Sequence, residues 1–178
     1  RFCMDINGIS DLAWKHTSKD TVLTCEEHSE VSKEDHFLSG DINSKVKVVT
    51  YSSLADPFSR RFDKTIRDLS ESYRDRVAFI FRHNPLGFIF QKADLAANAT
   101  ECIAHMSSEE NFFSYVYDLF KAQDQIAGFK ITEESLLDIA QNRYGMDKNK
   151  FKTCLSQKKY ASKIKSDLKS IEGTELET

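Results

Sequence analysis

Lys45-Val46-Lys47-Val48-Val49-Thr50-Tyr51 decides the fold, together with a second apolar run, Val77-Ala78-Phe79-Ile80-Phe81-Arg82-His83. Both runs are short, rich in β-branched or aromatic residues and nearly continuous in their apolarity, which predicts strands buried on two faces. Between them, apolar residues recur every three or four positions, as on one face of a helix. Strand, helix and strand form a βαβ unit, so the two strands run parallel with a right-handed connection. The helical stripe consists of Phe58, Phe62, Ile66, Leu69 and Tyr73.

The chain after Pro85 has a helical pattern almost to its end. Residues 92–106 are alanine-rich, and residues 132–144 begin with an acidic turn and are followed by Gly145, which matches helix start and stop signals. Further helices are expected at Asn111–Ala127, Asp147–Gln157 and Lys158–Ile171. The pattern divides the chain into an N-terminal segment (1–34), a βαβ core (35–91), a helical insertion (92–172) and a C-terminal tail (173–178).

Composition excludes several classes of function. With 178 residues, 40% of them hydrophobic, the chain suffices for one buried core with an insertion. Its net charge is −3 and its lysines alternate with acids, so no nucleic-acid partner is expected. No apolar run approaches the roughly 18 residues that suggest a membrane span, and Arg1–Ser10 lacks the apolar region of a secretory signal.

The histidines show neither HxxxH nor HExxH spacing, so we expect no metal site, and nothing in the sequence points to a cofactor. His83 ends the second strand, two residues before Pro85, and is interpreted as a structural residue. The five histidines are His16, His28, His36, His83 and His105.

Several motifs, in order along the chain, resemble those of the DsbA-like thiol–disulfide oxidoreductases. Asp41–Ser52 followed by Asp56–Phe62 is similar to the strand that leads into the family's Cys-Pro-x-Cys motif. The resemblance covers about residues 35–176 and implies a thioredoxin-like α/β domain with a helical insertion. It also implies polypeptide partners and an extracytoplasmic setting. The other matching segments are Phe81–Leu86 (FRHxPL in the family), Ala96–Cys102 (an alanine-rich helix) and Phe151–Tyr160 (F..CL...KY).

Asp56 and Ser59 stand where this family has its two catalytic cysteines, with Pro57 and Phe58 between them. In the family, the first cysteine attacks as a thiolate and the second resolves the mixed disulfide. A carboxylate cannot form a disulfide, and a serine hydroxyl is too weak an acid to attack without a positioned base. We therefore expect no intact catalytic residue here. The structural interpretation is that Asp56 caps the helix and Pro57 takes its first position, which stabilises a helix by about 1 kcal/mol.

A second departure concerns the family's cis-proline strand, which is expected after the last inserted helix. Pro57 and Pro85 are the only prolines of the sequence, and both precede the inserted helices. No residue after the last inserted helix can therefore be the family's cis-proline. A sheet without this strand would expose an edge prone to aggregation. Phe2–Ile9 resembles the family's FFINGxxI strand and turn, which predicts that residues 1–34 supply edge strands in a rearranged or circularly permuted chain. A truncated or divergent edge is the alternative. The expected hairpin comprises Phe2–Ile6 and Ile9–Ala13.

The four cysteines contain no CxxC pair, which excludes a zinc ribbon. The family resemblance implies a disulfide between Cys102 and Cys154 that holds the helical insertion together, with a stabilisation of about 4 kcal/mol for a loop of this length. Whether Cys3 and Cys25 form a second bridge stays open.

The leading interpretation is a redox-inactive DsbA-like protein that binds extended or unfolded polypeptides through the apolar surface around Phe58. The alternative is a cysteine-substituted variant of an enzyme that oxidises or isomerises disulfides in exported proteins. A third interpretation is an engineered or rearranged chain without biological activity.

Overall fold

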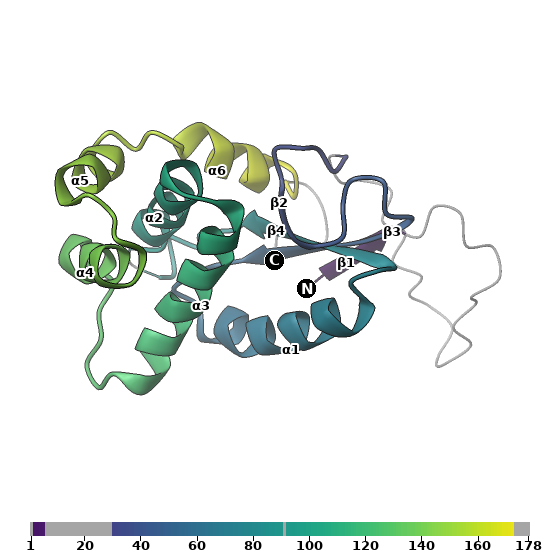
Figure 1. Cartoon of the computed structure of the whole chain (residues 1–178), viewed down its shortest axis with the longest axis horizontal. Helices are drawn as coiled ribbons and strands as arrows, with labels where there is room; N and C mark the ends of the chain where they lie inside the picture. The colour runs from purple at the N-terminus through teal and green to yellow at the C-terminus, as the bar shows by residue number, and fades with distance from the viewer. Residues whose placement is uncertain (1, 6–29, 91, 173–178) are drawn as a thin grey trace.

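The computed structural model describes residues 2–5, 30–90 and 92–172 of the chain. Its centre is a mixed sheet of four strands in the order β1-β3-β4-β2 (Figure 1). The two middle strands are parallel, with Val48 opposite Phe79 and Ser52 opposite His83. Each outer strand is antiparallel to its neighbour. The strands are β1 (Phe2–Asp5), β2 (His36–Ser39), β3 (Val46–Ser52) and β4 (Val77–His83).

Helices cover both faces of the sheet. Helix α1 (Pro57–Tyr73) connects β3 to β4 and lies on one face, where Ile66 packs against Val48 and Phe79. Helix α6 (Ala161–Lys169) lies across the other face, as Figure 1 shows. By connecting β3 to β4, α1 completes the βαβ unit that the two apolar runs predict.

The remaining helices gather at the end of the sheet where β3 and β4 finish (Figure 1). They enclose the largest apolar core of the described chain, and Phe81 from β4 reaches into it. Gly145, with a φ of 63°, ends the fourth helix in the left-handed conformation, as predicted. The four helices are α2 (Ala93–Met106), α3 (Glu109–Gln125), α4 (Glu133–Tyr144) and α5 (Lys148–Ser156).

Two features differ from the sequence-based expectation. Strand β2, at the edge next to β4, was not predicted, because it has only four residues and a register shift after Phe37 breaks its alternation. The apolar stripe of α1 is also less buried than its periodicity suggests. Ile66 is buried, whereas Phe58 is 73% exposed and Leu69 and Tyr73 are also exposed.

The N-terminal strand β1 pairs with β3, so that Met4 lies opposite Val48. The second half of the expected hairpin and Cys25 lie outside the described residues. Whether Cys3 and Cys25 form a bridge therefore stays open, and the division of the chain into four segments remains a prediction. Within the described ranges, none of the helices has the length and apolarity needed to cross a membrane.

Candidate functional site

The first turn of α1 is the place where the sequence puts the altered Cys-x-x-Cys motif. Asp56 is the N-cap of this helix, and Pro57 occupies its first position. The backbone N–H groups of Phe58 and Ser59 donate to the two carboxylate oxygens of Asp56 at 3.0 and 2.8 Å. The cap predicted from the sequence is confirmed, and it satisfies two of the N–H groups that a helix start otherwise leaves without partners.

Ser59 is held by the same carboxylate. Its hydroxyl donates to Oδ2 of Asp56 at 2.8 Å and accepts the backbone N–H of Ser53 at 3.2 Å. Asp56 and Ser59 thus form a local hydrogen-bonded unit that fixes the first turn of α1. The side-chain oxygens of Asp56 and Ser59 accept hydrogen bonds from backbone N–H groups, which favours a structural role for both residues.

Large apolar side chains lie exposed at this edge of the sheet. Ser52 and His83, the last residues of the parallel strands β3 and β4, lie opposite each other. Helix α1 and the segment after β4 therefore leave the sheet at the same end of these strands. Phe58 is 73% exposed at the start of α1, and Phe88 and Ile89 are 86% and 58% exposed after β4. Exposed aromatic and aliphatic residues of this size are typical of contact surfaces.

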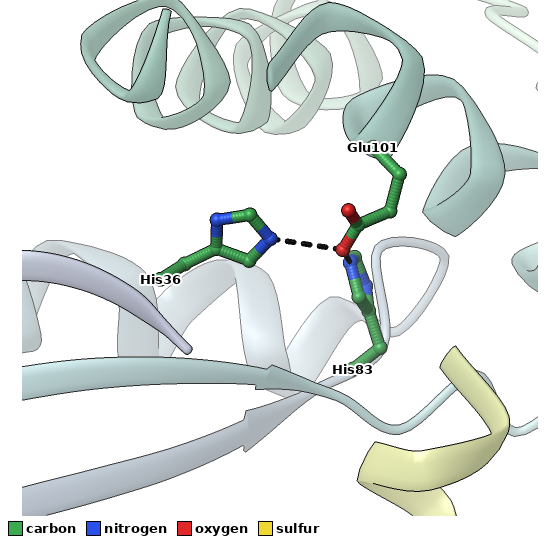
Figure 2. Close-up of side chains that lie close together, drawn as sticks. All are labelled: His36, His83 and Glu101. Atoms are coloured by element: carbon green, nitrogen blue, oxygen red, sulfur yellow. Dashed lines mark hydrogen bonds and ion pairs between the residues drawn. The ribbon is translucent and has the colours of Figure 1, made fainter. Parts of the chain in front are cut away.

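A buried polar cluster lies between the sheet and α2, and Figure 2 shows its three members pointing toward one another. The Nε2 atoms of His36 and His83 each lie 2.9 Å from the same oxygen, Oε1 of Glu101. His36 comes from β2, His83 from the end of β4 and Glu101 from α2. All three residues are buried. On the far side of its ring, His36 Nδ1 lies 2.9 Å from Oε2 of Glu109.

The charges of this cluster stabilise one another. Burial lowers the pKa of His36, but its hydrogen bonds to Glu101 and Glu109 outweigh that effect and raise the pKa to about 9. Burial raises the pKa of Glu101, but hydrogen bonds from His36 and His83 outweigh it and hold the pKa well below the usual range. The cluster therefore keeps an ionised carboxylate in the protein interior.

A second buried ion pair stands beside this cluster. Arg82 donates through Nε and Nη2 to the two oxygens of Asp35, at 2.7 and 2.9 Å. Both side chains are 4% exposed. The bidentate pair joins the residue before β2 to β4 and so fixes the strand that carries His36.

A disulfide joins Cys102 of α2 to Cys154 of α5, with 6.1 Å between their Cα atoms. This separation is ordinary for a disulfide. The bond ties the helix that carries Glu101 to the far side of the helical insertion.

Comparison with known proteins gives the family. The sequence model of the family described as "Thioredoxin" matches residues 32–178. The chain belongs to the thioredoxin family. Among solved structures, oxidised BdbD from Bacillus subtilis aligns with a TM-score of 0.68 and 21% identity, over 82% of this chain and 77% of that protein. The structure of α-DsbA1 from Wolbachia pipientis aligns with a TM-score of 0.65 and 22% identity, over 81% and 72%.

This thioredoxin-family chain therefore has the DsbA-like fold that its motifs predict, with helices inserted after the βαβ unit. A sequence relative is the Na⁺/H⁺ antiporter NhaA 3 of Salinispora tropica, 28% identical over 145 residues. The match covers 79% of this chain and 21% of that protein, so the chain spans about a fifth of the relative's length.

The sequence identified the first turn of α1 and missed the buried cluster. His36 and Glu101 are 65 residues apart, and His83 and Glu101 are 18 apart, so no spacing motif connects them. Only the pairing of β2 with β4 brings the two histidines together. The one signal available was the position of His83 at the end of a predicted strand.

Proposed function

We propose that this chain is a redox-inactive DsbA-like protein that binds extended or unfolded polypeptide segments at the edge of the sheet where α1 begins. The observation that carries the proposal is the first turn of α1. Asp56 and Ser59, which the motif resemblance assigns to the family's cysteine positions, bond to each other and to the backbone, while Phe58 between them remains exposed. The site thus keeps an apolar contact residue without a thiol.

The composition of this edge supports a polypeptide partner. Phe58 at the start of α1 and Phe88 and Ile89 after β4 are exposed apolar side chains on two segments that leave the sheet at the same end of its parallel strands. An extended segment can bury such side chains through its own alternate residues. We further propose an extracytoplasmic location, supported by the disulfide between Cys102 and Cys154, because disulfides persist in oxidising compartments.

Redox inactivity is tested with insulin reduction and dithiol oxidation by the full chain. We expect rates equal to the uncatalysed background. The double variant Asp56→Cys/Ser59→Cys is the positive comparison, because a thiol at the start of α1 has a lowered pKa and gains reactivity. Turnover by the unaltered chain above background would refute redox inactivity and favour an active disulfide oxidoreductase.

Polypeptide binding is tested with a carboxymethylated, permanently unfolded protein labelled for fluorescence anisotropy. We expect Phe58→Ser and Phe88→Ser to weaken binding, because each removes exposed apolar surface at the proposed site. Tyr73→Ser is the matched control, since Tyr73 is an exposed aromatic residue at the opposite end of the same helix. Equal losses in all three variants, or no binding at all, would contradict the proposed surface.

A further inference from the structure

The buried cluster of His36, His83 and Glu101 has the chemistry of a metal site. One potential ligand atom from each residue lies within 4.8 Å of the other two. We propose that these three side chains bind a divalent transition-metal ion, and that Zn²⁺ is the ion they fit best. The proposal is independent of the polypeptide-binding surface and replaces the expectation, based on sequence spacing, that the chain has no metal site.

The donor set is the first argument. Two imidazoles and one carboxylate are the protein ligands of many zinc sites, in which a water molecule takes the fourth position. Calcium and magnesium prefer sites built from oxygen atoms alone, so the two imidazoles disfavour both ions. Cys102, next to Glu101, is held in its disulfide with Cys154 and offers no thiolate.

Convergence on a single atom is the second argument. Both Nε2 atoms lie 2.9 Å from Oε1 of Glu101, and the dashed lines of Figure 2 include the contact made by His36. Three donors that already meet at one point need only small shifts to surround an ion with bonds of about 2.0–2.2 Å. The three come from β2, β4 and α2, so the ion would hold three separate elements together.

The groups behind the ligands are the third argument. Metal-binding histidines usually donate their other ring N–H to a carboxylate, a backbone carbonyl or water, which fixes the ring and its tautomer. His36 has this arrangement, because its Nδ1 lies 3.0 and 2.9 Å from the two oxygens of Glu109. Glu109 is itself held by the backbone N–H of Phe37 at 3.1 Å, and Phe112 stacks on the His36 ring with 3.8 Å between centroids.

Two buried polar atoms of the cluster are the fourth argument. Among the described residues, neither Oε2 of Glu101 nor Nδ1 of His83 has a hydrogen-bond partner. His105 Nε2 lies 3.6 Å from Oε2, beyond hydrogen-bond distance. Leaving a buried polar atom without a partner is energetically unfavourable. With an ion at this point, Oε2 of Glu101 can either bind the ion or accept a hydrogen bond from the water molecule on it.

Metal binding must displace protons. Each Nε2 that hydrogen-bonds to the Glu101 carboxylate carries a hydrogen, and the ion takes its place on the nitrogen. The proton of His36 leaves to solvent, since Nδ1 of this ring keeps its own hydrogen for Glu109. The hydrogen of His83 moves from Nε2 to Nδ1 of the same ring, so that this imidazole binds the ion in its neutral form. Zn²⁺ affinity should therefore fall as the pH is lowered.

The first experiment uses the full chain freed of metal with a chelator and titrated with Zn²⁺ by calorimetry. We expect one tightly bound ion per chain. We expect Glu109→Gln to weaken binding by about 10- to 100-fold as a positioning variant. His36→Gln and Glu101→Gln should weaken it further. Glu110→Gln is the matched control for Glu109→Gln, because Glu110 is an exposed glutamate in the same first turn of α3; it should leave the affinity nearly unchanged.

A second measurement keeps the test independent of how the variants fold. X-ray absorption of the Zn²⁺-loaded, unaltered chain should show nitrogen or oxygen ligands at about 2.0–2.1 Å, imidazole scattering and no sulfur. Absence of Zn²⁺ binding by the unaltered chain would overturn the proposal and show that hydrogen bonds alone hold the cluster together. Unchanged affinity in folded His36→Gln and Glu101→Gln, or a spectrum with sulfur or without imidazole, would overturn it as well.

Discussion

Replacing the helix cap Asp56 by alanine tests how the altered motif contributes to the fold. The carboxylate accepts two backbone N–H groups and the Ser59 hydroxyl, and its charge lies at the N-terminus of a 17-residue helix. Loss of a cap of this kind costs about 1 kcal/mol, and loss of the favourable charge a further 0.3–1 kcal/mol, roughly. We expect Asp56→Ala to lower the free energy of unfolding by about 1–2 kcal/mol.

Asp56→Asn is the matched variant for this prediction. Asparagine keeps one oxygen that can accept from a helix N–H group but loses the second acceptor oxygen and the charge, so its cost should be about 0.5–1 kcal/mol, less than that of alanine. Urea unfolding followed by circular dichroism measures both variants. Equal losses for alanine and asparagine would show that the remaining oxygen of asparagine does not cap the helix, and a loss below about 0.5 kcal/mol for alanine would refute the capping argument.

The remaining predictions concern buried groups. Replacing Cys102 and Cys154 by alanine should lower the free energy of unfolding by about 4 kcal/mol, measured in urea, because the disulfide closes a loop with a sequence separation of 52; a loss below about 1 kcal/mol would contradict this. Asp35→Asn should lower the free energy of unfolding by about 1–3 kcal/mol in the same assay, because it removes the carboxylate that pairs with Arg82, which keeps its bonds to Tyr51 and Glu30; Asp35→Glu should recover part of this loss. In chelator-treated protein, stability should fall as the pH rises from about 6.5 to about 9, because folded His36 keeps its proton until its pKa of about 9 whereas the unfolded histidine loses it near 6.5. His36→Gln should flatten this part of the stability curve, and an unchanged curve would argue against the raised pKa.

The parts of the fold that could be predicted are those with a local periodic signal. The apolar runs of β3 and β4, the stripe of α1 and the start and stop residues of α4 each lie within a single element. Strand β2 could not be predicted, because its four residues, His36–Ser39, show no alternation that distinguishes a strand from a loop. It becomes a strand by pairing with β4, which is a tertiary effect.

The same contrast applies to the two sites. The cap at Asp56 follows from the identity of neighbouring residues, since an acidic residue before a proline and an apolar helix is a local signal. The cluster of His36, His83 and Glu101 depends on the order of strands in the sheet and on how α2 packs over it. A histidine in an unrecognised strand gives no indication of its distant partners.

The strand pairings also have a consequence for the rate at which the protein folds. Each ladder of the sheet joins residues far apart in sequence, such as Met4 with Val48, Phe37 with Ile80 and Val48 with Phe79. Helices α2 to α5, in contrast, pack mainly against close neighbours along the chain. Contacts between distant residues require the closure of long loops, which slows folding. The sheet should therefore assemble after the helical insertion, and pulse-labelled hydrogen exchange can measure this order. The histidine cluster, which joins β2 and β4 to α2, would be completed only in that last step.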